Sequence, residues 1–280
     1  MIRKQGTIGT ENCLPLLTII IPVYNEVGTI DELLRRVIIV PIEKQIIVVD
    51  DGSTDGSGEL LRKWSQTGDV LILRHTTNRG KGRAIRTGLQ RALGEYSIIQ
   101  DADLEYDPQD YLHLIHVVQS GAADVVLGSR YLNGTNAQVG YWFRLGVSVL
   151  NMIVKLLYHV TLTDEATCYK ATTTAILRRM DLQCERFEFC PELVAKACRM
   201  NLRIREVAIS YYPRNAEAGK KIRLKDGWAA ACALWRWRKW VEGSNSLVPS
   251  QQPGRGSGLL DAKHEEFVPG PCEIAAEVES

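Results

Sequence analysis

The sequence predicts one α/β domain with a mostly parallel central sheet and helices on both faces. Four apolar segments of strand length follow one another in the first half of the chain, and segments with amphipathic helical spacing separate them. This alternation is typical of parallel sheets, because a parallel connection needs a crossover helix. A length of 280 residues and a hydrophobic content of 45% suit one sizeable core.

The composition argues against several classes of protein. A formal net charge of +1 gives no basis for nucleic-acid binding. The seven cysteines contain no Cys-x-x-Cys pair, which favours free thiols over a disulfide framework or a zinc site. The first residues lack the apolar core of a signal peptide, and no segment reaches the roughly 18 uninterrupted apolar residues of a membrane-spanning helix. We therefore expect a cytoplasmic protein, at most peripheral on the cytoplasmic face of a membrane.

The first predicted strand covers residues 16–23, a continuous apolar segment typical of a central strand. It ends around Pro22, which has no N–H to donate to a sheet. Thr29, followed three residues later by Glu32, predicts a capping box at the start of a helix. The apolar face expected for that helix contains Ile30, Leu33, Leu34 and Val37.

Two further strand–helix units follow. Strand 45–49 leads into residues 50–57, a turn that places carboxylates where open α/β sheets bind ligands, although turn formation alone also explains it. Strand 70–73 leads into residues 78–83, a glycine-rich basic loop that suits an approach to phosphate and opens a helix through about Leu93. This loop matches neither the P-loop nor the Gly-x-Gly-x-x-Gly pattern, so the sequence disfavours enzymes of those two types.

The fourth unit begins with strand 97–99 and continues into an acidic segment. Its four carboxylates stand at alternate positions, Asp101, Asp103, Glu105 and Asp107. They repel one another unless a cation lies among them, and Mg²⁺ or Mn²⁺ prefers such oxygen ligands. A solvated acidic loop is the alternative. A helix at 109–119 and a strand at 124–130 follow.

Helices in the second half combine apolar and basic residues. Residues 141–160 form one predicted helix, which either packs on the core or lies on a membrane or a lipid substrate. An amphipathic helix is predicted at 187–197. In the last helix, residues 227–240, four Trp residues stand among cations, and they either pack on the domain or lie at a headgroup layer.

A cationic loop, residues 213–225, follows an alternating segment at 202–212 that predicts an edge strand. Five of its residues are basic and one is acidic, so it is either a solvated loop or a binding loop for a phosphate group. Residues 243–280 are rich in Gly, Ser, Pro and Glu, which predicts a disordered tail. With residues 1–15 as a loose N-terminal arm, the predicted domain covers residues 16–240.

Five short motifs carry a resemblance to a known family. They are Pro22-Val-Tyr-Asn-Glu26, Asp50-Asp-Gly-Ser53, Asp101-Ala-Asp103, Gly128-Ser-Arg130 and the loop from Arg214 to Lys220. In this order and spacing they resemble family 2 glycosyltransferases, most closely the dolichyl-phosphate mannose synthases and the bacterial polyprenyl-phosphate sugar transferases. The resemblance covers about residues 16–240 and implies a single Rossmann-like GT-A domain.

The resemblance also implies roles for individual residues. Contacts to the nucleotide are expected from Pro22, Tyr24, Glu26, Val49 and Asp51. Mg²⁺ or Mn²⁺ and the diphosphate are expected at Asp101 and Asp103, with Ala102 between them. Glu105 stands where the synthase family usually has Gln, and its carboxylate also suits a hard cation. Cationic groups on the donor and acceptor phosphates are expected at Arg130, Arg214 and Lys220.

The function that the resemblance implies is a metal-dependent, inverting transfer of a hexose from a GDP- or UDP-sugar to a polyprenyl or dolichyl phosphate, as in cell-envelope glycan biosynthesis. A phosphate acceptor needs no general base, and the dense cationic loop favours it. The first alternative is transfer to a saccharide or other soluble hydroxyl, with Asp164 as the base. The other role for Asp164 is to tie residues 163–170 together by hydrogen bonds. The second alternative is a non-catalytic sugar-nucleotide-binding protein.

One departure from the family concerns the membrane. Many relatives have C-terminal transmembrane helices, and none is predicted here. A lipid acceptor would then require peripheral docking, by residues 141–160 or by the Trp-rich helix, or a membrane-protein partner.

Overall fold

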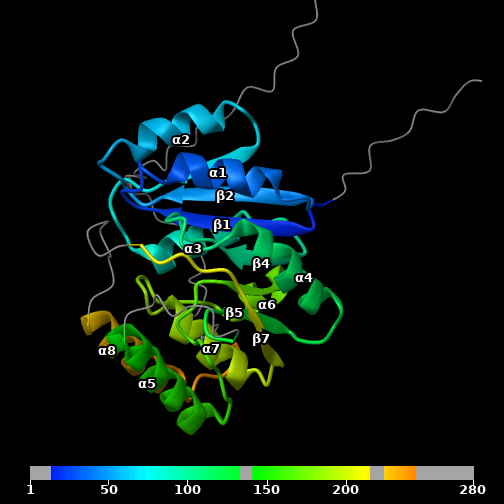
Figure 1. Cartoon of the computed structure of the whole chain (residues 1–280), viewed down its shortest axis with the longest axis vertical. Helices are drawn as coiled ribbons and strands as arrows, with labels where there is room; N and C mark the ends of the chain where they lie inside the picture. The colour runs from blue at the N-terminus through cyan, green and yellow to red at the C-terminus, as the bar shows by residue number, and fades with distance from the viewer. Residues whose placement is uncertain (1–13, 133–140, 215–223, 244–280) are drawn as a thin grey trace, which may run out of the picture.

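A single mixed sheet organises the computed structural model, which describes residues 14–132, 141–214 and 224–243 (Figure 1). Within these residues, seven strands lie in the order β3-β2-β1-β4-β6-β5-β7. The first four strands in the chain are mutually parallel: β1 (Leu17–Val23), β2 (Lys44–Asp50), β3 (Val70–Arg74) and β4 (Tyr96–Ile99). The predicted α/β fold with a mostly parallel sheet is confirmed.

The registers of the parallel strands bring their carboxyl ends to one edge of the sheet. Val23 of β1 pairs with Asp50 of β2, which pairs in turn with Arg74 of β3. β4 runs beside β1 as far as the pair of Ile20 and Ile99. The polar residues that follow β1, β2 and β4 therefore meet at this edge, which lies on the left in Figure 1.

The first helices cover the sheet as the apolar spacing predicts. They are α1 (Ile30–Ile39), α2 (Ser57–Ser65), α3 (Lys81–Gln90) and, after the short 3₁₀ turn η1 (Pro108–Asp110), α4 (Tyr111–Gln119). All four residues of the predicted apolar face of α1 are buried. The predicted capping box is wrong: the Thr29 hydroxyl donates to the Glu26 carboxylate at 2.9 Å and makes no cap bond to the helix.

The second half of the sheet contains a strand that the sequence did not predict. β6 (Lys170–Thr173) inserts between β4 and β5 (Val125–Ser129) and is antiparallel to both. Its four residues, Lys-Ala-Thr-Thr, include no apolar run. β7 (Ile204–Ala208) pairs in parallel with β5 at the end of the sheet, so the predicted edge strand is confirmed.

Three helices form a group at the lower end of the molecule in Figure 1. α5 (Tyr141–Tyr158) and α7 (Phe189–Arg199) both pack against α8 (Leu224–Trp237), and the Tyr158 hydroxyl donates to the Leu234 carbonyl at 2.5 Å. The short α6 (Thr174–Arg179) follows β6 directly. Within the described ranges, no helix has the length and apolarity needed to cross a bilayer. The predicted arm and tail lie almost wholly outside these ranges.

Candidate active site

The loops after β1 and β2 are joined by hydrogen bonds at the carboxyl edge of the sheet. The main-chain N–H of Asn25 donates to Ser53 Oγ at 3.0 Å, and that of Glu26 donates to Ser57 Oγ at 2.9 Å. The N–H of Val27 donates to Asp55 Oδ2 at 3.0 Å. The Ser and Asp residues after β2 therefore do more than form a turn, because they fix the loop that contains Tyr24 and Glu26.

Asp51 holds the glycine-rich loop after β3 in place. Its carboxylate accepts hydrogen bonds from the main-chain N–H groups of Arg79 and Gly80, at 2.9 and 2.7 Å. His75 Nδ1 lies 2.6 Å from Asp51 Oδ1, and His75 Nε2 lies 2.9 Å from the Thr87 hydroxyl. The buried side chain of Asp51 thus contacts protein groups, and the loop it fixes forms the neighbouring surface.

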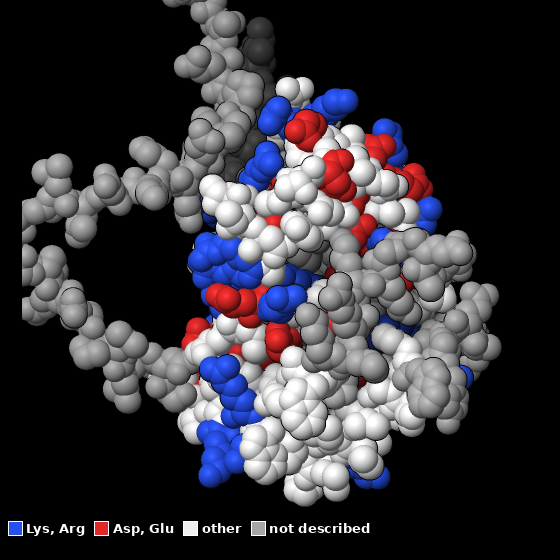
Figure 2. All heavy atoms as spheres, turned by 90° about the vertical axis from the view of Figure 1, so that its left-hand side faces the viewer, with Lys and Arg blue, Asp and Glu red and all other residues white. Residues whose placement is uncertain are grey.

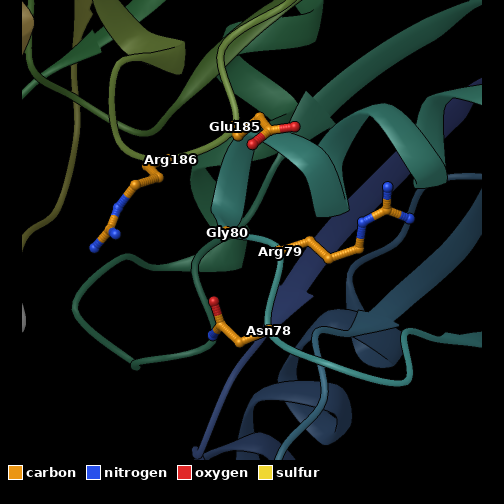
Figure 3. A pocket seen from close by; sticks show the side chains of 5 residues that line it. All are labelled: Asn78, Arg79, Gly80, Glu185 and Arg186. Atoms are coloured by element: carbon orange, nitrogen blue, oxygen red, sulfur yellow. The ribbon is translucent and has the colours of Figure 1, made fainter.

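Two glycines let this loop and the start of α3 approach a distant segment of the chain. A Cβ on Gly80 would lie 2.3 Å from the Glu185 carbonyl oxygen, and one on Gly82 would lie 2.2 Å from that of Cys184. A pocket of about 340 Å³ lies at this contact, lined by Asn78, Arg79, Gly80, Glu185 and Arg186 (Figure 3). The sequence indicated the basic loop, but it did not indicate that Arg186 would join it.

Asp101, directly after the end of β4, pairs with a lysine from the start of α3. Lys81 Nζ lies 2.6 Å from Asp101 Oδ1 and 3.5 Å from Cys168 Sγ. Burial lowers the pKa of Lys81, but the charge and hydrogen bond of Asp101 act together with Cys168 and Cys190 and raise the pKa well above its usual value. The lysine is therefore a fixed positive charge beside Asp101. The sequence did not indicate this lysine as a site residue.

Arg214 connects the loop after β1 with the acidic segment after β4. Its Nη2 lies 2.9 Å from Glu26 Oε2 and 3.8 Å from Asp103 Oδ2, and its Nε donates to the Asp103 carbonyl at 2.8 Å. Three residues predicted for the site thus meet although they lie far apart in the sequence. Lys220, the other predicted cation of this loop, lies outside the described residues.

The carboxylate of Glu105 binds the segment that contains Tyr211 and Arg214. Its Oε1 accepts from the main-chain N–H of Arg214 at 3.0 Å, and its Oε2 accepts from the Tyr211 hydroxyl at 2.7 Å. In the described part of the chain, no three acidic, His or Cys side chains converge as a metal site. The structure therefore does not bring together the expected set of Asp101, Asp103 and Glu105. Two aspartates at alternate positions still offer the hard oxygen ligands that Mg²⁺ or Mn²⁺ prefers.

Arg130 and Asp164 form an ion pair inside the domain. Arg130 Nε and Nη2 each lie 2.7 Å from a carboxylate oxygen of Asp164, and the main-chain N–H of Arg130 donates to the same carboxylate at 3.0 Å. The exposed fractions are only 4% and 0%. The carboxylate of Glu206 accepts from the main-chain N–H groups of Thr163 and Asp164. Asp164 thus anchors its segment, and its side chain is fully buried.

Three further residues predicted for the site are buried or partly buried. Val49 is fully buried against Ile47 and Ala84, and Ala102 is almost fully buried between the two aspartates. Pro22 is partly buried at the end of β1. Figure 2 looks onto this edge of the molecule and shows Lys and Arg atoms beside Asp and Glu atoms across its middle. The arrangement offers carboxylates for a cation and cations for a phosphate.

Comparison with known proteins agrees with this arrangement. Residues 18–184 match the sequence model of a family described as Glycosyl transferase family 2. The chain is 29% identical, over 76% of its length, to the low-salt glycan biosynthesis hexosyltransferase Agl6 of Haloferax volcanii, but it spans only 52% of that protein. It is 30% identical to the polyprenol monophosphomannose synthase of Mycolicibacterium smegmatis, with 72% of this chain and 79% of that protein covered.

A solved structure shares the fold. It is the glucosyl-3-phosphoglycerate synthase of Mycobacterium tuberculosis in complex with Mn²⁺, UDP-glucose and phosphoglyceric acid. The TM-score is 0.58 at 16% identity, and the similarity covers 82% of this chain and 81% of that one. At this identity the similarity concerns the architecture, which matches the GT-A fold expected from the sequence.

Proposed function

Because this chain belongs to glycosyl transferase family 2, we propose that it transfers a hexose from a nucleotide sugar to a polyprenyl phosphate at the cytoplasmic face of a membrane. The observation that carries this proposal is the position of Arg214, whose guanidinium lies between Glu26 and Asp103. A cation at the meeting point of the β1 and β4 loops suits the negative charge of both a donor diphosphate and an acceptor phosphate.

The donor half of the site would use the two aspartates after β4. Asp101 and Asp103 would hold Mg²⁺ or Mn²⁺, which supplies Lewis-acid stabilisation to the leaving diphosphate when bound. Lys81 and Arg214 are paired with these aspartates, and both would contact the diphosphate as it enters. Tyr24 and Glu26, on the loop that Ser53 and Ser57 fix, would contact the nucleotide.

The acceptor half favours an anionic oxygen over a hydroxyl. A hydroxyl acceptor needs a general base, and Asp164, the candidate for that role, is buried and bound to Arg130 through both carboxylate oxygens. A phosphate oxygen is already a nucleophile. It would attack the anomeric carbon as the bond to the nucleoside diphosphate breaks and the electron pair leaves with the diphosphate. A direct displacement of this kind inverts the configuration of the sugar.

The relatives support the choice of acceptor. One is named as a polyprenol monophosphomannose synthase, and others at 31% identity are named as undecaprenyl-phosphate 4-deoxy-4-formamido-L-arabinose transferases. The polyprenyl carrier common to these names supports a lipid phosphate as the proposed acceptor of this chain.

Release of nucleoside diphosphate tests the proposal directly. Purified protein with Mg²⁺ or Mn²⁺ is offered GDP- and UDP-sugars, with and without a short polyprenyl phosphate. We expect release that depends on the lipid phosphate and disappears in Asp103→Ala. Asp69→Ala, which removes an exposed carboxylate before β3, is the matched control and should retain full activity. Release supported equally well by a soluble saccharide would indicate a hydroxyl acceptor, and binding without any release would indicate a non-catalytic protein.

A further inference from the structure

Helix α5 is apolar on two sides, and only one of them is explained by the core. Its buried side packs into the domain through Val147, Leu150 and Val154. A second stripe, at helical spacings of four, three and four residues, remains exposed at Leu145, Val149, Met152 and Leu156. Their exposed fractions run from 43% to 68%. Packing on the core requires only the buried apolar side of the helix. The exposed apolar stripe therefore needs a separate explanation.

Helix α8, which packs beside α5, repeats this pattern with aromatic residues. It buries Ala230, Ala233 and Leu234 but exposes Trp228 by 75% and Trp235 by 57%. The two tryptophans are seven residues apart and therefore lie on the same side of the helix. Tryptophan is enriched at the interface between water and lipid, because its ring is apolar and its N–H is polar. We define the α5–α8 face by these two tryptophans and the exposed stripe of α5.

The charges around the α5–α8 face are mostly positive. Between residues 143 and 158, α5 contains Arg144 and Lys155, both exposed, and no Asp or Glu. The end of α8 and the residues after it add Arg236, Arg238 and Lys239, and the guanidinium of Arg238 lies 3.6 Å from the ring centroid of Trp235. Figure 2 shows Lys and Arg among uncharged atoms over the lower part of the molecule. Apolar side chains flanked by cations complement an anionic lipid surface.

A hollow at the end of α5 fits the same partner. It has a volume of about 510 Å³ and is lined by Met152, Lys155, Leu156, His159 and Thr161. Its walls combine two residues of the exposed apolar stripe with the basic side chains of Lys155 and His159. An apolar wall beside a cation suits a lipid headgroup, whose phosphate lies next to the first methylene groups of its chains.

We infer that the α5–α8 face docks the protein on the surface of a bilayer that contains anionic phospholipids. The inference rests on the proposed function in one respect, because a lipid-linked acceptor would give the docking a purpose. Vesicle binding itself requires no turnover. The side chains of the exposed α5 stripe and of Trp228 and Trp235 would enter the headgroup region, while the cations contact lipid phosphates. α5 would then lie in the plane of the membrane and would not cross it.

Vesicle co-sedimentation of the full chain tests this docking. Vesicles of phosphatidylglycerol and phosphatidylcholine should bind the protein, and vesicles of phosphatidylcholine alone should bind it more weakly. Leu156→Asp should weaken binding by about tenfold or more, because moving one leucine side chain out of water is worth a factor of this size. Ile39→Asp is the matched control: Ile39 is 71% exposed on α1, at the opposite end of the molecule in Figure 1, and its substitution should change nothing.

Several results would overturn the docking inference. They are a wild-type chain that does not bind anionic vesicles, equal binding by Leu156→Asp, and an equal loss in Ile39→Asp. Self-association that Leu156→Asp abolishes, without vesicle binding, would assign the face to a second copy of the chain. Turnover of a short, water-soluble polyprenyl phosphate separates the two proposals. If this turnover persists while the protein does not bind vesicles, only the docking inference is contradicted. If the protein binds vesicles but this turnover is absent, only the proposed function is contradicted.

Discussion

The main-chain N–H of Arg214 donates a 3.0 Å hydrogen bond to Glu105 Oε1, so an acidic residue of the β4 loop fixes the backbone of the arginine that reaches Glu26 and Asp103. The second oxygen of Glu105 accepts from Tyr211, three residues before Arg214. From this geometry we propose that Glu105 positions Arg214. The expectation from the sequence was a third carboxylate for the metal.

Substitution of Glu105 separates these two roles. Glu105→Ala should lower kcat/KM for the acceptor by about tenfold or more, because the segment that carries Arg214 loses two hydrogen bonds. Glu105→Gln should retain most activity, since its amide oxygen can still accept from the Arg214 N–H. The affinity for Mn²⁺, measured by calorimetry with the nucleoside diphosphate present, should stay the same in both variants. A large loss of Mn²⁺ affinity in Glu105→Gln would instead identify Glu105 as a metal ligand.

Lys81 should weaken the binding of a divalent cation and strengthen the binding of a diphosphate. Its ammonium lies 2.6 Å from Asp101, so a metal ion at Asp101 must share the carboxylate with it. Lys81→Met should therefore strengthen the binding of Mn²⁺ alone by about threefold to tenfold and weaken the binding of free nucleoside diphosphate by a similar factor. Titration calorimetry measures both. Parallel losses of both affinities would mean that the lysine acts only through the fold.

The ion pair of Arg130 and Asp164 should contribute mainly to the stability of the folded protein. Asp164→Asn leaves the buried Arg130 charge without its partner, which should lower the free energy of unfolding by about 3–5 kcal/mol. The matched control is Asp124→Asn, which breaks the pair with the exposed Arg203 and should have a much smaller effect. Denaturant unfolding of both variants checks the difference. Similar losses in the two would contradict the interior role of the Arg130 pair.

Glu165 should make the protein less stable as pH rises. Its carboxyl is fully buried, and neither oxygen has a hydrogen-bond partner among the residues that the structure describes. Burial raises its pKa from 4.5 to about 7, with Asp164 acting in the same direction and Lys170 and Arg130 opposing. The folded state therefore retains a proton that the unfolded state has lost. The associated stability is fully present below pH 4.5 and is lost as pH rises through about 7.

The variant Glu165→Gln isolates this effect, because its side chain stays neutral. Relative to the wild type, the variant should gain on the order of 3 kcal/mol of unfolding free energy between pH 4.5 and pH 8. Asp110, whose pKa burial raises to about 6, contributes equally to both proteins and cancels in the comparison. Unfolding curves at four or five pH values are sufficient. A constant difference between the two proteins at all pH values would show that Glu165 does not titrate in this range.

The sequence predicted the part of the fold that local pattern determines. β1, β2 and β4 are continuous apolar segments, and the carboxylates after them mark the edge where the site lies. β6 has only four residues and little apolar character, and its place in the sheet depends on pairing with two strands already formed. No local pattern encodes such a pairing, and so β6 was missed.

The candidate site was predicted by residue type but not by contact. The sequence suggested Arg130 as a phosphate-binding cation and Asp164 as a possible base, whereas the fold buries both against each other. It also gave Glu105 the chemistry of a metal ligand, and the position of Tyr211 and Arg214 gives its oxygens other partners. Whether a charged side chain faces a ligand or another side chain depends on tertiary neighbours that lie far away in the sequence.

Among the described strands, β6 alone joins β4 to β5, and this has a consequence for the chain as it is synthesised. β1 to β4 are complete once Ile99 has left the ribosome, but the strand that covers the open side of β4 begins only at Lys170. For on the order of ten seconds of translation, the nascent chain carries half a sheet with unpaired N–H and C=O groups along one side. A chain truncated before Lys170 would keep that side open and would tend to aggregate through it.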